Sequence, residues 1–88
     1  MEEPGLDEAG LVAADKLDAG LRGCGELVLE LKLRMRALRA GELLRLVAHD
    51  AGAPEDLPAW CRLTGHRLRF ARHPVYWIER KPETTERT

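Results

Sequence analysis

The stretch from residue 25 to residue 38 constrains the fold more than any other part of the chain. It contains no proline and no glycine after its first residue, and its apolar residues recur at helical spacing. At about 100° per residue, one stripe of this predicted helix carries Cys24, Leu27, Val28, Leu31, Met35 and Leu38. We expect this stripe to face the core.

Two leucines, Leu29 and Leu33, fall on the opposite side of the same helix, one turn apart. Two interpretations stay open at this stage. The pair forms a contact patch for a partner, or the helix is tucked under a loop that covers it.

The second predicted helix follows the sequence Asp56-Leu57-Pro58. Asp56 is a good N-cap, Gly65 is well placed to end the helix, and Pro58 fits only in a first turn. The expected core face consists of Leu57, Trp60, Cys61 and Thr64. Around the two helices we expect strands over residues 16–19, 43–48, 67–71 and 75–80, a loop over 49–54 and a turn over 72–74.

The resulting order, β-α-β-α-β-β, predicts an α+β fold. We expect a two-layer sandwich with two helices on one face of a four-stranded mixed sheet. We expect residues 1–14 to be a flexible acidic N-terminal segment, 15–81 the folded domain and 82–88 a flexible tail.

Composition excludes several classes of protein. Eighty-eight residues make one small domain, and two cysteines far apart give neither a disulfide framework nor a zinc pair. The acidic start lacks the pattern of a signal peptide, and no apolar run has membrane-spanning length. We therefore expect a cytoplasmic protein, with no metal and no cofactor.

Charge is segregated along the chain, with acids near the start and arginines concentrated over residues 59–81. An arginine-rich strand face permits nucleic-acid binding as one hypothesis. Because the chain lacks a glycine-rich clamping loop and an RNP-type aromatic motif, we do not expect direct nucleic-acid binding.

The candidate reactive residue is Cys24, between Gly23 and Gly25 where the first helix is expected to start. Unpaired N–H groups and the helix dipole favour the thiolate there, and the glycines leave it accessible. Arg22 adds positive charge or is merely solvated, whereas Glu26 opposes ionisation. The alternative is that Cys24 is a small apolar residue closing the helix start.

Other side chains receive structural interpretations. Cys61 fits the core, unless the fold brings it to Cys24 as a resolving thiol. The histidines lack metal-ligand spacing, the acids after the second strand fit turns and caps, and the last-strand aromatics fit sheet packing. These residues are His49, His66 and His73; Asp50, Glu55 and Asp56; and Tyr76 and Trp77.

Several of these positions together resemble the TusA family of small sulfur carriers, also called SirA-like proteins. The matching positions, within residues 17 to about 80, are Asp18, Cys24, Gly41, Asp50 and the run Glu55-Asp56-Leu57-Pro58. The resemblance implies the βαβαββ fold and assigns Cys24 to the cysteine of the family's Cys-Pro-x-Pro motif. That motif reads Cys24-Gly25-Glu26-Leu27 here.

The resemblance implies that Cys24 accepts sulfur as a persulfide from a cysteine desulfurase or rhodanese-like donor. A sulfurtransferase-type carrier of this kind passes the sulfur to an acceptor protein in a relay towards tRNA thiolation, molybdenum-cofactor chemistry or sulfur metabolism. We expect a monomer or weak dimer. The alternative is a non-catalytic interaction or regulatory module that keeps the fold without sulfur transfer.

Overall fold

The computed structural model describes residues 10–82, and for Cys24 the backbone alone. Its elements follow the predicted order and alternate between strand and helix until a final strand pair. They are β1 (Asp15–Gly20), α1 (Cys24–Ala37), β2 (Leu43–Ala48), α2 (Ala53–Thr64), β3 (Arg67–Arg72) and β4 (Val75–Glu79). The flexibility expected of the two ends stays a prediction, because residues 1–9 and 83–88 lie outside the described residues.

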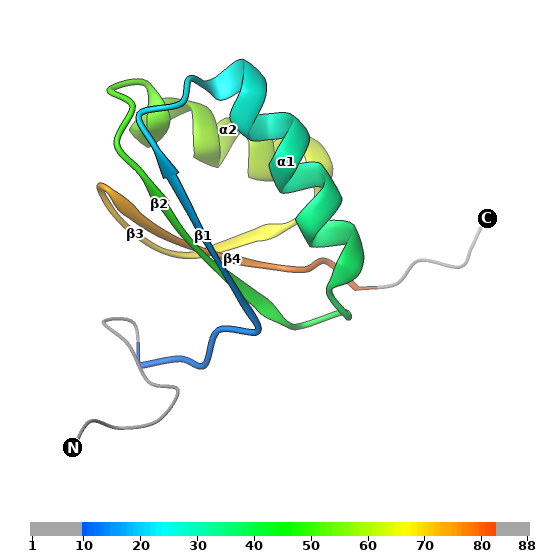
Figure 1. Cartoon of the computed structure of the whole chain (residues 1–88). Coiled ribbons are helices and arrows are strands. Elements are labelled where there is room, and N and C mark those ends of the chain that lie inside the picture. The colour runs from blue at the N-terminus through cyan, green and yellow to red at the C-terminus, as the bar shows by residue number, and fades with distance from the viewer. Residues whose placement is uncertain (1–9, 83–88) are drawn as a thin grey trace.

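The four strands form one mixed sheet in the order β1-β2-β4-β3. β1 and β2 are parallel and are joined through α1, whereas β4 runs antiparallel to both of its neighbours. Both helices lie on the same face of the sheet (Figure 1). The predicted α+β class and the two-layer arrangement are therefore confirmed.

The core lies between the helices and the sheet. α1 contributes its predicted stripe, of which Leu27, Leu31 and Met35 are buried and Val28 and Leu38 are half-buried. Each fully buried side chain of this size stabilises the fold by about 1.5–3 kcal/mol relative to exposure. The sheet and α2 contribute Leu17, Leu44, Leu46, Tyr76, Ile78, Leu57 and Cys61.

The face of the sheet without helices also holds a buried aromatic residue. Trp77 alternates with the core residues Tyr76 and Ile78 along β4, and it is paired with Arg45 and Phe70 on the neighbouring strands. Its side chain is fully buried. The structure thus confirms that the last-strand aromatics pack in the sheet.

The start of α2 differs from the prediction. The helix begins at Ala53, and its N-cap is Gly52 rather than Asp56. The Gly52 carbonyl oxygen accepts hydrogen bonds from the N–H groups of Glu55 and Asp56, at 3.1 and 2.9 Å. Asp56 therefore lies inside the first turn, and the predicted loop over residues 49–54 is shorter by two residues.

Pro58 consequently lies inside α2 and not in its first turn. Proline has no N–H to donate within a helix, which normally ends or kinks it. Here Leu57 and Cys61, on either side of Pro58, are buried against the sheet. This packing stabilises the helix beyond its local propensity. At the other end, the prediction for Gly65 is confirmed, since it caps α2 in the left-handed region with φ of 91°.

Candidate functional site

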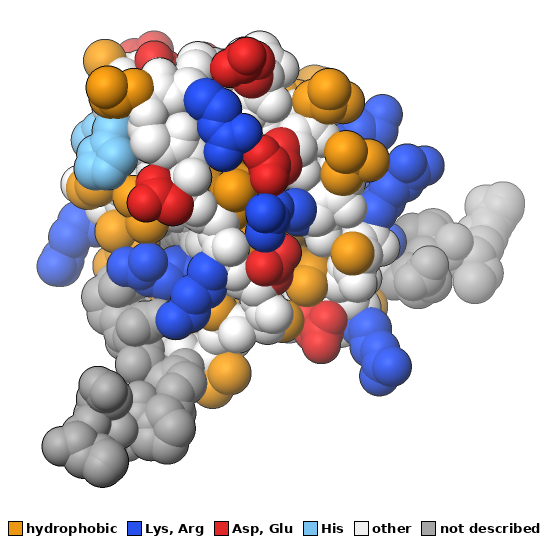
Figure 2. Space-filling model, in the orientation of Figure 1, with side chains coloured by type: hydrophobic (Ala, Val, Ile, Leu, Met, Phe, Trp, Pro, Cys, Tyr) orange, Lys and Arg blue, Asp and Glu red, His pale blue; other side chains and the backbone are white. Residues whose placement is uncertain are grey.

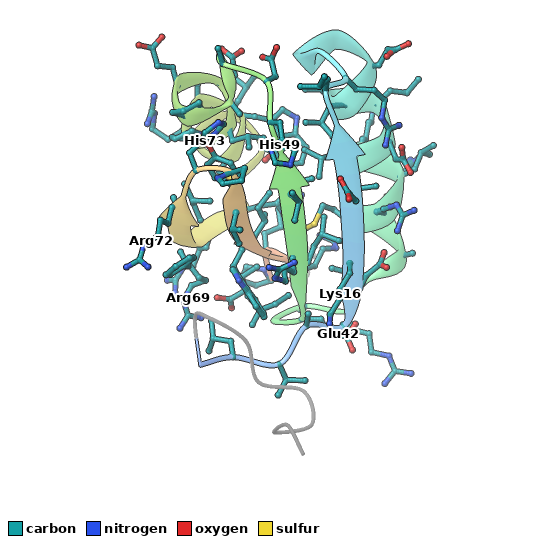
Figure 3. All side chains as sticks on the ribbon, turned by 60° about the vertical axis from the view of Figure 1, so that its left-hand side comes forward. Lys16, Glu42, His49, Arg69, Arg72 and His73 are labelled. Carbon is teal, nitrogen blue, oxygen red and sulfur yellow. The ribbon has the colours of Figure 1, made fainter. Side chains whose placement is uncertain are left out.

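The candidate site lies at the end of the sheet where β1 and β2 have their carboxyl termini and α1 begins (Figure 1). The two loops at this end are joined, because the N–H of His49 donates to the carbonyl oxygen of Gly20 at 3.0 Å. Figure 3 shows His49 and His73 at this end of the sheet, whereas Lys16 and Glu42 lie at the opposite end. The loop that leads into Cys24 is therefore held against the end of β2.

Cys24 is the first residue of α1, one position earlier than the predicted start at Gly25. The N-cap Gly23 is extended, with φ of −76° and ψ of 168°, and no described side chain caps the helix. The first turn thus keeps its positive dipole end unneutralised apart from Glu26, which is exposed. This is the backbone setting that lowers a thiol pKa.

The backbone on both sides of Cys24 is open. Gly23 and Gly25 are exposed, and a Cβ on either would meet no described atom within 4 Å. A partner can therefore approach the start of α1 closely from either glycine. The thiol of Cys24 itself lies outside the described atoms, so its assigned reactivity stays a prediction.

Arg22 braces the loop before Cys24. Its Nε donates to the carbonyl oxygen of Ala19 at 3.2 Å, and its Nη1 contacts Glu30 Oε1 at 2.5 Å. Arg22 is thus neither merely solvated nor an uncompensated positive charge, because the carboxylate of Glu30 offsets its guanidinium.

The same carboxylate links the loop to α1 and β1. Glu30 Oε2 accepts from Arg34, and Arg34 contacts Asp15 on β1 at 3.1 Å. Hydrogen bonds from Arg22 and Arg34 lower the pKa of Glu30. Only the Glu30–Arg34 spacing was visible in the sequence. The contacts of Arg22 with Glu30 and of Asp15 with Arg34 join residues eight and nineteen positions apart, so no local sequence pattern predicts them.

Leu29 and Leu33 are 63% and 56% exposed, so no loop among residues 10–82 covers them. They line a surface hollow of about 650 Å³ together with Asp15, Glu26, Glu30, Arg34 and Ala37. Figure 2 shows this side of the molecule, where acidic and basic side chains alternate and hydrophobic side chains gather beside them. The partner-contact interpretation therefore stays open, and the covered-helix interpretation is wrong for the described chain.

Cys61 is a structural thiol. It is 3% exposed within the core, and burial raises the pKa of Cys61 to about 11. The protonated thiol is a small apolar group at neutral pH, as the sequence predicted.

Two of the histidines, His66 and His73, and the acid Asp50 have side-chain partners in the fold. His73 Nδ1 lies 2.7 Å from the hydroxyl of Tyr76, and His66 Nδ1 accepts the N–H of Lys81. Asp50 Oδ2 accepts the N–H of Gly52 at 3.0 Å, which makes Asp50 a turn residue as predicted. Among the described residues, no group of three or more His, Cys, Asp or Glu side chains could hold a metal ion.

Fold and site together define a class: a small two-layer α+β protein that presents a cysteine at the start of its first helix. The family model described as Sulfurtransferase TusA matches residues 15–78. The chain belongs to the TusA family.

Named relatives agree with this assignment. The chain is 35% identical over 71 residues to the sulfur carrier protein TusA of Pseudomonas putida (strain W619), covering 76% of this chain and 89% of that protein. It is 36% identical over 64 residues to the sulfur carrier protein TusA of Pseudomonas savastanoi pv. phaseolicola (strain 1448A / Race 6), covering 68% and 76%. It is 44% identical over 50 residues to the putative sulfur carrier protein YrkF of Bacillus subtilis (strain 168), covering 57% of this chain and 27% of that protein.

No helix within residues 10–82 is long and apolar enough to cross a membrane.

Proposed function

We propose that this chain carries sulfur as a persulfide on Cys24, taking it from a donor enzyme and passing it to an acceptor protein. The observation that carries the proposal is the position of Cys24 as the first residue of α1 in a member of the TusA family. The open backbone at Gly23 and Gly25 supports it, because both transfer steps need a partner thiol to reach the sulfur.

The chemistry is two thiol–persulfide exchanges. The Cys24 thiolate attacks the outer sulfur of a persulfide on a cysteine desulfurase or rhodanese-like donor. A sulfur–sulfur bond forms at Cys24 while the donor's sulfur–sulfur bond breaks, and the donor cysteine leaves as a thiolate. An acceptor thiolate then attacks the outer sulfur of the Cys24 persulfide. The outer sulfur stays bound to the acceptor, and Cys24 leaves as a thiolate. Sulfur is transferred without a net oxidant or reductant.

Each residue around the cysteine has a role in this proposal. The helix start favours the Cys24 thiolate both as attacking and as leaving group. Arg22 positions the loop through Ala19 and Glu30, and Glu26 limits the fall in the thiol pKa. We assign the relay to the cytoplasm, where thiols stay reduced. tRNA thiolation is one pathway that such a relay serves.

The test is intact-mass analysis after incubation with a cysteine desulfurase and cysteine, without reductant. We expect wild type to gain one sulfur, and dithiothreitol to remove it. Cys24→Ser should gain none, whereas the matched control Cys61→Ala should gain sulfur as wild type does. Absence of the increment on wild type, with Cys24 also slow to alkylate, would favour the non-catalytic interaction module.

A further inference from the structure

A second hollow lies on the helix side of the molecule, away from the loop before Cys24. It is a groove of about 620 Å³ between α1, the last turn of α2 and the ends of the sheet strands. Its lining residues are Val28, Lys32, Arg36, Trp60, Leu63, Thr64, His66, Arg80 and Lys81. Sulfur transfer at Cys24, as proposed above, uses none of these side chains.

The charged side chains of residues 10–82 that line this groove have one sign. Lys32, Arg36, Arg80 and Lys81 are basic, and no Asp or Glu of that part of the chain lines it. None of these four takes part in an ion pair within residues 10–82. Like charges gathered without a counter-charge repel one another, and a bound anion would relieve that repulsion.

Arg80 contributes a guanidinium group to this basic cluster. Its Nε is buried and has no hydrogen-bond partner among the described residues. The backbone holds Arg80 in place, since its N–H donates to Glu42 and its carbonyl oxygen accepts from Gly41. A carboxylate or phosphate oxygen is the acceptor that guanidinium groups bind most strongly.

The neighbouring groups are equally fixed. Lys81 Nζ donates to the carbonyl oxygen of Thr64 at 2.9 Å, and the Lys81 N–H donates to His66 Nδ1 at 3.1 Å. Burial, followed by the charges of Lys81 and Arg80, lowers the pKa of His66. A neutral His66 at physiological pH leaves the basic side chains as the source of the positive potential.

Part of the groove's lining is apolar. Val28, Trp60 and Leu63 contribute to it, and the rings of Trp60 and His66 lie 5.5 Å apart between centroids. A ligand that fits both features has an anionic group for the basic side chains and an apolar or aromatic part for the apolar side chains. We propose that this groove binds a small organic anion, with a carboxylate or phosphate at Arg80 and an aromatic group against Trp60.

The test is an NMR titration of the ¹⁵N-labelled full chain at constant ionic strength. The probes are phenyl phosphate, benzoate, inorganic phosphate and phenol. We expect phenyl phosphate and benzoate to shift the amide signals of Trp60, His66 and Lys81 saturably. Phenol lacks the anionic group and inorganic phosphate lacks the aromatic group, so each should bind with an affinity at least about tenfold lower. Shifts that do not saturate, or that spread equally over the arginines of β3, would overturn the proposal.

Variants locate the site. Arg36→Ala and Arg80→Lys should each weaken binding of phenyl phosphate, the latter because lysine keeps the charge but lacks the planar guanidinium that binds a phosphate through two N–H groups. Arg72→Ala, on the exposed strand β3, is the matched control and should bind as wild type. Wild-type affinity in both groove variants would contradict the assignment. Binding of a hexaglutamate peptide when neither small anion binds would also contradict it, and would identify a protein partner instead.

Discussion

At the scale of single residues, the two cysteines differ in the structure that surrounds their backbone. Cys24 begins a helix between two exposed glycines, whereas Cys61 lies in the middle of the core. A thiol at the first kind of position ionises readily, and a thiol at the second stays protonated. Helical periodicity placed both cysteines on apolar stripes, and only the glycines beside Cys24 distinguished the two positions in the sequence.

The buried thiol predicts a pH dependence of stability. Burial raises the pKa of Cys61 from 9.0 to about 11, so the unfolded chain loses this proton at lower pH than the folded chain does. Between these two values the folded state binds more protons, and its stability falls as the pH rises. We expect urea unfolding to show a loss of stability from about pH 9 to about pH 11. Cys61→Ala should lose this part of the slope; an unchanged slope in that variant would contradict the assignment.

The glycine after Cys24 gives a second prediction at this scale. Gly25 is the second residue of α1, and a Cβ there would meet nothing within 4 Å. α2 already carries Pro54 at its own second position. Gly25→Pro should therefore fit and should stabilise the fold by about 0.5–1 kcal/mol, mainly by restricting the unfolded chain.

Urea unfolding of Gly25→Pro, with Gly25→Ala as the matched control, measures this effect. Because proline also restores the family's Cys-Pro pair, we expect sulfur uptake to be at least as fast as in wild type. A less stable Gly25→Pro protein would show that the N–H of Gly25 or the helical conformation of Cys24 is needed as it stands.

At the scale of elements, local patterns predicted existence and order better than boundaries. β2 matches its predicted range, and α1 is displaced by one residue. The prediction for the start of α2 was wrong, because the rules applied to Asp56 and Pro58 describe only local conformational preference. Burial of Leu57 and Cys61 against the sheet is a tertiary effect that those rules do not contain.

The next prediction concerns the ion pairs of Glu30, which connect the loop before Cys24 with α1 and, through Arg34, with β1. Hydrogen bonds from Arg22 and Arg34 hold the pKa of Glu30 below its ordinary value of 4.5. A lowered folded pKa means that the stabilising effect is present above the unfolded pKa and is lost as the pH falls through the folded value. We expect the stability difference between wild type and Glu30→Gln to shrink below about pH 4.5.

Urea unfolding at several pH values measures this difference, and hydrogen exchange of residues 20–23 reports on the loop. The difference at neutral pH should be small, because the side chains of these ion pairs are partly exposed. Glu55→Gln, an exposed acid in the first turn of α2, is the control. Equal pH dependence in both variants would show that Glu30 does not stabilise the loop specifically.

At the scale of the whole molecule, the fold gathers residues that the sequence separates. The basic groove joins two helices with the residues on either side of the β3–β4 hairpin, and no spacing along the chain indicates it. The two leucines on the outside of α1 are the opposite case. Helical periodicity predicted that they share a face, and only the folded chain shows that the face is open.

Because this face is open, we expect substitutions on it to change sulfur uptake without changing the stability of the fold. The double variant Leu29→Asp, Leu33→Asp should keep wild-type stability to within about 0.5 kcal/mol per residue, since both side chains are exposed. If the donor enzyme docks there, charges on the apolar hollow should slow persulfide formation at Cys24 at least tenfold. Alkylation of Cys24 by iodoacetamide, which needs no docking, should keep its wild-type rate.

The matched control is Val12→Asp, an exposed apolar residue outside the hollow, and it should take up sulfur as wild type does. Slow alkylation in the double variant would place the damage at the thiol and not at a docking surface. Normal sulfur uptake in the double variant would remove Leu29 and Leu33 from the interface. The donor would then approach Cys24 over the open backbone of Gly23 and Gly25, on the side of the loop that Arg22 braces.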